Sequence, residues 1–190
     1  MAAKQFDLKT KRGYQLDEVV SALQKSIRRG LEEEAAYWAL ELADSGMGQY
    51  LWRRLMVIAF EDIGLGSPDV VNLVVSGWIA TKEATKTWAE MRHEMLGTVI
   101  LAMCRAMKSR EGDDFLWLVM TKRGKEPLKE VPDFALDEHT SRGRSMGRGV
   151  QFWFSDASRL ETPEPPPLGY YGKAVRVLFE EQEVNGQGAG

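Results

Sequence analysis

The strongest constraint on the fold of this chain is the stretch of residues 25–69, KSIRRGLEEEAAYWALELADSGMGQYLWRRLMVIAFEDIGLGSPD. Apolar residues recur in it at spacings of three and four, which is the period of an amphipathic helix. Glycines interrupt it at Gly30, at Gly46 and Gly48, and again at Gly64 and Gly66, where helices commonly end. The stretch therefore predicts three helices in close succession, which pack together to bury their apolar faces.

The same reasoning gives helices over most of the chain. The expected ranges are 16–29, 32–43, 50–63, a segment opened by Pro68 behind Ser67, 91–108, a segment from Asp113 or Asp114 to 121, and 170–182. The β-branched residues after Pro68 would also suit a buried strand. A helix is favoured there because the neighbours are helical and no partner strand is evident.

This pattern predicts an all-α fold: a multi-helix domain with a loop-rich C-terminal third. Residues 1–16 are polar and charged, and we expect a flexible arm there. A single helical domain is expected over 17–182, irregular over 124–169 where prolines and glycines gather, followed by a disordered tail over 183–190.

Composition limits the possible partners and the compartment. The 25 basic and 28 acidic side chains give a formal charge of −3, so no general basic field attracts nucleic acid, and any such contact must be local. The one cysteine, Cys104, cannot form an internal disulfide, which indicates a reducing, cytoplasmic location. No apolar run approaches the length of a membrane-spanning helix, and no signal peptide is evident.

Asp62 is the sharpest chemical anomaly. On a helical projection it lies on the same face as Leu55 and Ile58, so its carboxylate points toward the core at the end of a helix. An ionised carboxylate there needs a cation or several donors. Arg28 and Arg29, which end the first predicted helix, are the natural partners, and a structural ion pair or helix-end network is favoured over catalysis.

Three further charges are predicted on the opposite face of the same helix, namely Arg53, Arg54 and Glu61. Arg54 and Glu61 are two turns apart on one side, close enough to share a network, while Arg53 is freer. The two interpretations are a solvated charged surface and an interface with another subunit or a phosphate backbone.

The sequence does not support catalysis or a cofactor. Residues 57–62, VIAFED, imitate a Walker B strand, but the chain has no G-x-x-x-x-G-K-[ST] phosphate loop, so no ATPase activity is expected of this chain alone. Asp137, Glu138 and His139 are consecutive, which is a poor arrangement for one ion, and His93 is distant, so no metal site is expected.

Residues 137–149, DEHTSRGRSMGRG, form the strongest local concentration of basic side chains among glycines. Its basic members are His139, Arg142, Arg144 and Arg148. Glycines allow a backbone to approach a phosphate and arginines neutralise it, so contact with nucleic acid or another phosphate is one interpretation. The other is a surface loop whose arginines pair with the protein's own carboxylates.

Several motifs resemble the C-terminal domain of the RarA/MgsA family of clamp-loader-like AAA+ ATPases. They are SALQKSIR at 21–28, AAYWALEL at 35–42, LWRRLMVIAFEDIGL at 51–65, VPDF at 131–134, and the pair Tyr170 and Tyr171. The resemblance implies an all-α domain related to the clamp-loader collar that forms an oligomer, usually a tetramer. It also implies action at stalled replication forks, with DNA ends and single-strand-binding protein as partners.

The chain departs from the family in two respects. MKSREGDD at 107–114 stands where the family has a PKSN-like turn, and the ATPase core is missing. Met1 and the insertion-like stretch 137–149 favour a stand-alone protein over a trimmed one.

The expected function is a non-catalytic oligomerisation or protein-interaction domain in DNA replication, recombination or repair. Its partners would be further copies of itself, single-strand-binding protein or an AAA+ ATPase, and DNA. The alternative is a nucleic-acid-binding module that uses the loop from Arg142 to Arg148.

Overall fold

A computed structural model describes residues 8–82 and 92–187 of the chain. Every regular element in these ranges is a helix, which confirms the predicted all-α fold, and the only pairing of strand type in them is an isolated bridge between Lys9 and Gln15. The chain divides into two compact units. One unit comprises Met1–Leu116 with Tyr171–Gly190, and the other comprises Trp117–Tyr170.

The first two helices have nearly the predicted bounds. Helix α1 spans Leu16–Arg29 and α2 spans Glu32–Asp44. Gly30 separates them with a φ of 71°, a left-handed conformation that glycine adopts without strain, and its N–H bonds to the last carbonyls of α1. The turn is therefore tight, and it brings α2 back along α1.

The third predicted helix changes character before its end. Helix α3 spans Gly48–Ile58, and the chain then forms a π-helical turn, η1 (Ala59–Ile63), and a 3₁₀ turn, η2 (Gly64–Gly66). A single π-helical turn inside a helix is uncommon and often marks a functional place. Here it carries the two acidic residues of the predicted motif.

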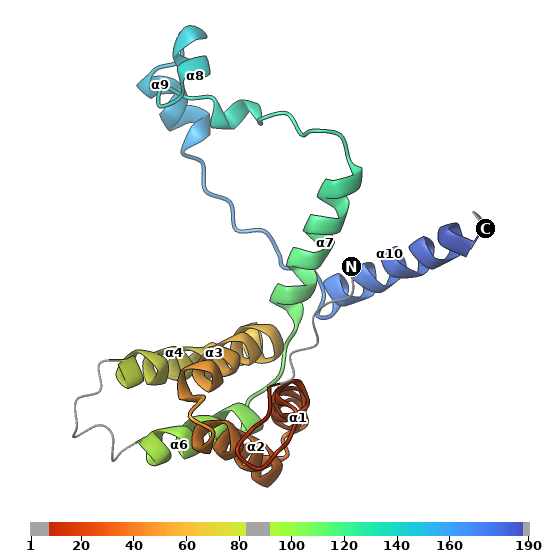
Figure 1. Ribbon diagram of the computed structural model, residues 1–190. Coiled ribbons are helices and arrows are strands. Elements are labelled where there is room, and N and C mark those ends of the chain that lie inside the picture. Colours follow the sequence, from red (N-terminus) through yellow and green to blue (C-terminus); the bar gives the residue numbers. More distant parts are fainter. Residues whose placement is uncertain (1–7, 83–91, 188–190) are drawn as a thin grey trace. The chain divides into compact units, whose positions relative to one another are not determined.

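Two more helices complete the body, which we define as α1, α2, α3, α4 and α6 (Figure 1). Helix α4 spans Pro68–Lys82, so the helical interpretation of this β-branched segment is confirmed. Helix α6 spans Arg92–Arg105 and ends before the predicted 108; residues 83–91 lie outside the described ranges. The buried core of the body consists mainly of aliphatic side chains, among them Leu23, Ile27, Leu42, Leu51, Leu55, Ile58, Val74, Ile100 and Met103.

The described part of the N-terminal segment, residues 8–15, forms a turn that contacts α2. Two contacts with Glu41 hold this turn against α2. The backbone N–H of Arg12 donates to Glu41 Oε1 at 3.1 Å, and the Arg12 side-chain Nε lies 3.5 Å from Glu41 Oε2. The hydroxyl groups of Tyr14 and Tyr37 lie 3.0 Å apart. These partners are more than 20 residues away in sequence, so the local polarity of the segment carries no information about them.

Helices α7 (Glu111–Lys125) and α10 (Tyr170–Gln187) follow the body in the sequence. Helix α10 extends into the predicted tail 183–190, as far as Gln187. The predicted irregular region 124–169 contains four short helical elements of the second unit: η3 (Asp133–Ala135), α8 (Ser141–Ser145), α9 (Val150–Phe152) and η4 (Trp153–Ala157). Within the described residues no helix is long and apolar enough to cross a bilayer.

Candidate functional site

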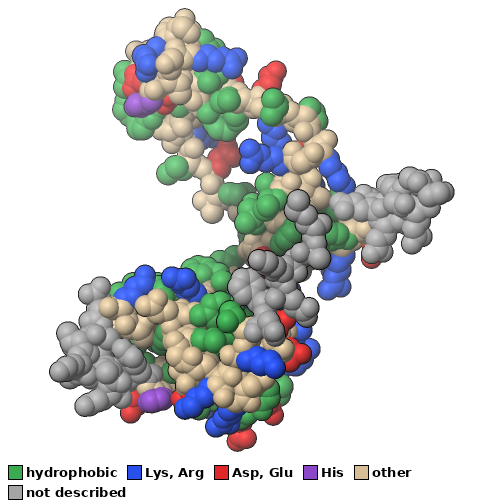
Figure 2. Space-filling model, in the orientation of Figure 1, with side chains coloured by type: hydrophobic (Ala, Val, Ile, Leu, Met, Phe, Trp, Pro, Cys, Tyr) green, Lys and Arg blue, Asp and Glu red, His purple; other side chains and the backbone are tan. Residues whose placement is uncertain are grey.

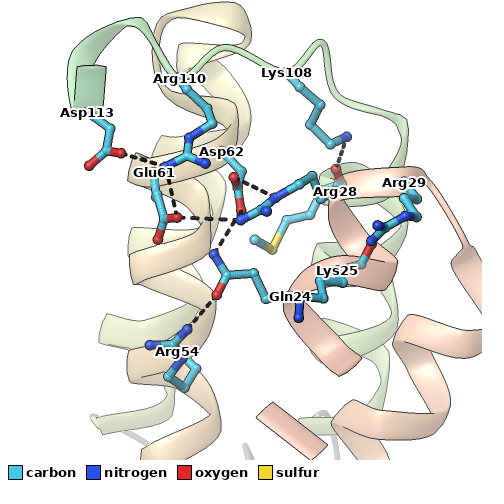
Figure 3. A network of polar contacts seen from close by, with 11 residues as sticks. Gln24, Lys25, Arg28, Arg29, Arg54, Glu61, Asp62, Lys108, Arg110 and Asp113 are labelled. Carbon is cyan, nitrogen blue, oxygen red and sulfur yellow. Dashed lines mark hydrogen bonds and ion pairs between the residues drawn. The ribbon is translucent and has the colours of Figure 1, made fainter. Parts of the chain in front are cut away.

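A network of polar side chains joins the end of α1 to the π-helical turn η1 (Figure 3). Its centre is Asp62, which is 1 % exposed. Arg28, in the last turn of α1, places Nε 2.9 Å from Asp62 Oδ1 and donates from Nη2 to Asp62 Oδ2 at 3.2 Å. The Nε contact is an ion pair without the alignment of a hydrogen bond. A buried carboxylate thus faces an arginine across the junction of two helices.

Gln24 extends this network to α3. Its Nε2 donates to Asp62 Oδ2 at 3.0 Å, and its Oε1 accepts a hydrogen bond of 2.7 Å from Arg54 Nη2. Gln24 lies one helical turn before Arg28, so both side chains of α1 reach the same carboxylate. The amide is used as donor and acceptor at once, which fixes its orientation.

Glu61 extends the network in the other direction, toward α7. Its Oε1 lies 3.5 Å from Arg28 Nη2 and 3.4 Å from Arg110 Nη2. Arg110 also donates to Asp113 Oδ2 at 2.7 Å, and this hydrogen bond is the main reason that the pKa of Arg110 is raised. Charged contacts therefore connect the first turn of α7 with η1 and α1.

The backbone makes a second connection at the same place. The N–H of Ser109 donates to the carbonyl oxygen of Asp62 at 3.0 Å. A Cβ on Gly66 would lie 2.5 Å from the carbonyl oxygen of Met107, and one on Gly64, whose φ is 45°, would lie 3.1 Å from that of Ser109. The two glycines thus allow η2 to lie directly on the segment between α6 and α7.

Lys108 closes the end of α6. Its ammonium group donates to the carbonyl oxygens of Met103, Cys104 and Ala106 at 2.8, 3.0 and 2.9 Å. These carbonyls have no partner inside the helix end, so the lysine replaces the missing donors. Burial lowers the pKa of Lys108, and the carbonyl contacts compensate for part of the lost hydration.

The predicted site residues of the helical body have different partners. Of the two arginines proposed for Asp62, Arg28 makes the contact, whereas Arg29 donates to the carbonyl oxygen of Lys25 at 3.1 Å. Arg53 is exposed and makes no ion pair or hydrogen bond within the described residues. Arg54 contacts Gln24, and Glu61 contacts Arg28.

The contacts of Arg54 and Glu61 have a geometric cause. On a helical projection both lie about a quarter turn from the core-facing side rather than half a turn. Their side chains can therefore reach around the flank, and both join the network that contains Asp62. No sequence pattern singled out Gln24, Arg110 and Asp113 as members of the network, although the turn at 107–114 that departs from the family pattern contains Arg110 and Asp113.

A groove lies beside the network, between α3, η1 and the first turn of α7. It has a volume of about 680 Å³ and is lined by Arg53, Met56, Val57, Phe60, Glu61, Gly112, Asp113 and Leu116. The floor is mostly apolar. Arg53 is an unpaired cation among its lining residues, and Glu61 and Asp113 are the two acids that Arg110 joins.

The second unit contains the predicted basic loop, and its four basic residues are not equivalent. His139 Nδ1 lies 2.8 Å from Asp137 Oδ2, and this contact raises the pKa of His139. Arg144 bonds to the carbonyl of Glu138 at 3.0 Å and to the hydroxyl of Ser141 at 3.3 Å. Arg142 is exposed and has no side-chain partner in the part of the chain that the structure describes.

Arg148 holds this unit together. Its Nη2 contacts both carboxylate oxygens of Asp133 at 2.7 and 2.8 Å, and its Nη1 donates to the carbonyls of Asp133 and Leu136. The guanidinium also lies 4.1 Å from the ring centre of Phe152. Gly143 approaches the backbone of Asp137 so closely that no Cβ would fit. Arg148 is therefore engaged inside the unit.

Within residues 8–82 and 92–187, no group of three or more His, Cys, Asp or Glu side chains is arranged to hold a metal ion. Cys104 is buried, and burial raises the pKa of its thiol, so the reactive thiolate is disfavoured. The network of Arg28, Glu61, Asp62 and Arg110 is consequently a set of mutually paired charges at a helix junction.

The sequence model of the MgsA AAA+ ATPase C-terminal family matches residues 31–162, more than half of the chain. The chain belongs to this family. The matched MgsA region contains α2 to η4, and with them Glu61, Asp62, Arg110 and every residue that lines the groove. Helix α10 and the α1 members of the network, Gln24 and Arg28, lie outside the matched range.

Three relatives of this MgsA-family chain show how much of a longer protein it matches. Replication-associated recombination protein A of Bacillus subtilis is 28 % identical over 135 residues, which cover 71 % of this chain and 31 % of that protein. The protein of the same name from Escherichia coli is 25 % identical over 79 % of this chain and 32 % of its own length. ATPase WRNIP1 of Dictyostelium discoideum is 35 % identical over 78 % of this chain and 18 % of its own. The chain thus spans about a third or less of these relatives.

Proposed function

We propose that this chain is a non-catalytic helical domain that associates with further copies of itself and works in DNA replication, recombination or repair. The observation that carries the proposal is the apolar surface at the groove. Phe60 is 60 % exposed, Leu116 55 % and Val57 44 %, and all three line the groove. Apolar side chains gathered on one surface are typical of a protein–protein contact.

Helix α7 supports the same proposal. Leu118 is its only buried residue, while Phe115, Leu116, Trp117, Val119 and Met120 are exposed. Exposure of these apolar side chains to water is unfavourable. We therefore expect another protein surface to cover them in the assembled protein. Hydrophobic side chains open to solvent are visible on the body in Figure 2.

The charged network gives the groove a defined shape. Glu61 lies in η1 and Asp113 in α7, and Arg110 contacts both, so it joins the two walls. Glu61 also contacts Arg28, which is held by Asp62. We therefore assign Arg28 and Asp62 an architectural role, and Arg53 the role of an exposed interface residue.

The names of the relatives suggest where such an assembly acts. A tetramer is expected from the family resemblance, and an AAA+ ATPase or single-strand-binding protein would be the natural heterologous partner. The relatives are replication-associated recombination proteins, and this chain matches about a third of the Bacillus subtilis and Escherichia coli proteins. A match to about a third of a relative's length is consistent with one domain that assembles a larger protein.

Light scattering coupled to size exclusion tests the proposal. We expect the wild type to elute as an oligomer at tens of micromolar, and Phe60→Asp to elute as a monomer because a carboxylate would be buried in the contact. Ile79→Asp is the matched control, since Ile79 on α4 is also exposed but does not line the groove. A monomeric wild type, or equal loss of assembly in both variants, would refute the proposal.

A second candidate function is nucleic-acid binding by the second unit. It is favoured by Arg142 and Arg144, which are exposed on α8 and make no ion pair with a described carboxylate. Fluorescence anisotropy with a labelled single strand at low salt tests it, using Arg142→Ala with Arg144→Ala. Arg148 is unsuitable as a probe because its loss would loosen the unit itself.

A further inference from the structure

We infer that the groove between α3, η1 and the first turn of α7 receives helix α10 of a second copy of the chain. The inference rests on the proposed self-association and names the segment that makes the contact. It connects two features, an apolar groove and an amphipathic helix that no helix of the body packs along within the described residues.

Helix α10 has the composition of a packed helix, but its described side chains are half-buried or exposed. None of its described side chains, residues 170–180, is buried, and no helix of the body packs along it. On a helical projection Val175, Leu178 and Phe179 form one apolar face, and Lys173 and Glu180 lie on the opposite side. Such a face lies in an apolar groove in helix-in-groove recognition.

The start of α10 lies beside the groove. The rings of Tyr171 and Phe115 are in edge contact with their centres 5.1 Å apart. A Cβ on Gly172 would lie 2.7 Å from Asp114 Oδ2, so α10 begins against the first turn of α7. Both Phe115 and Asp114 neighbour the groove residues Asp113 and Leu116 in sequence.

The charges of groove and helix are complementary. The groove has the cation Arg53, which has no partner within the described residues, and the acids Glu61 and Asp113. Helix α10 offers Arg176 on the flank beside Phe179, whereas Glu180 lies on the far side from the apolar face. With the apolar face in the groove, Arg176 can therefore reach the acidic groove residues Glu61 and Asp113.

The occupant is a second copy because α10 is held at its first turn in its own chain. Its apolar face lies one to two turns beyond that attachment, and 18 helical residues extend about 27 Å. A reciprocal exchange, in which each copy places α10 in the groove of the other, is the isologous arrangement common in symmetric dimers. A larger assembly can be built from such pairs.

Cysteine cross-linking between copies tests the inference. In a Cys104→Ala background, one preparation carries Val57→Cys in the groove and a second carries Phe179→Cys on α10. We expect the mixed preparations to form a disulfide-linked dimer on oxidation, and a mixture of Ile79→Cys with Phe179→Cys to form at least tenfold less. The single variant Phe179→Asp, made in the otherwise wild-type chain, should also have a smaller mass in light scattering than the wild type.

The outcomes separate the inference from the proposed function. An oligomeric protein that gives no cross-link between Val57→Cys and Phe179→Cys would overturn the inference and leave self-association intact. A third preparation carries Val57→Cys and Phe179→Cys in the same chain; a cross-link that forms only within that chain, and not between the mixed single-cysteine chains, would overturn the second copy as occupant. A wild type that is monomeric at every concentration would overturn both.

Discussion

Replacing Arg28 with alanine should destabilise the protein more than replacing its partner Asp62. The first change leaves a carboxylate that is 1 % exposed without its cation, and Gln24 remains as its donor. Removing one partner of a fully buried ion pair costs about 3–5 kcal/mol. The Arg28 side chain is 35 % exposed, so water reaches the edge of the site. We therefore expect a cost of about 2–4 kcal/mol for Arg28→Ala.

The Asp62→Ala change has the smaller expected cost. It leaves a partly exposed guanidinium that still lies 3.5 Å from Glu61, and about 1–2 kcal/mol is expected from the lost hydrogen bonds. The double variant should cost less than the sum of the two single changes. A coupling of about 1–3 kcal/mol is typical of residues in direct contact.

Urea denaturation followed by circular dichroism measures these free energies of unfolding. Arg29→Ala is the matched control, because Arg29 is the neighbouring arginine, is exposed, and bonds only to the carbonyl of Lys25. If Arg28→Ala and Arg29→Ala differ by less than about 0.5 kcal/mol, or if the effects of Arg28→Ala and Asp62→Ala simply add, the network does not hold the helix junction.

Three further outcomes are expected. Gly66→Ala should lower the midpoint of unfolding in urea, whereas Gly48→Ala should not, since a Cβ at Gly66 would meet the backbone of Met107 at 2.5 Å and one at Gly48 would meet nothing. Contacts with Thr10 and Arg12 lower the pKa of Glu41 from 4.5. Ionised Glu41 therefore adds to the free energy of unfolding above that pH, and this contribution is lost as the pH falls through the folded-state pKa. Glu41→Gln should accordingly make the free energy of unfolding less dependent on pH in the acid range. Asp137→Asn should return the raised pKa of His139 toward 6.5, and an NMR titration in which the His139 pKa is unchanged would contradict this contact.

The helical fold could be predicted from the sequence because its signals are local. The spacing of Val19, Leu23 and Ile27 gives α1, and Gly30 ends it, so the bounds of that helix follow from residues inside it. The π-helical turn at 59–63 could not be predicted, because its cause lies outside the local pattern. It places Glu61 toward Arg110, a residue almost 50 positions later.

The candidate site was predictable only in its centre. Asp62 was recognisable because a charge on an apolar face needs a partner, and Arg28 was a reasonable one because it ends the preceding amphipathic helix. Gln24 gave no such signal, since an uncharged amide on a helix flank is ordinary. Arg148 was also misleading: glycine-arginine composition suggests an open phosphate contact, whereas its contacts with Asp133 and Phe152 depend on the folded unit.

Arg110 bridges two segments of the chain, and this should couple their local unfolding. Because this one side chain contacts η1 and the start of α7, and η1 in turn contacts α1, these segments are expected to lose amide protection together rather than one by one. Slowly exchanging amides in the last turn of α1 would then report on events at α7, although these segments lie more than 80 residues apart in the chain. The region would behave as a single cooperative unit of local unfolding.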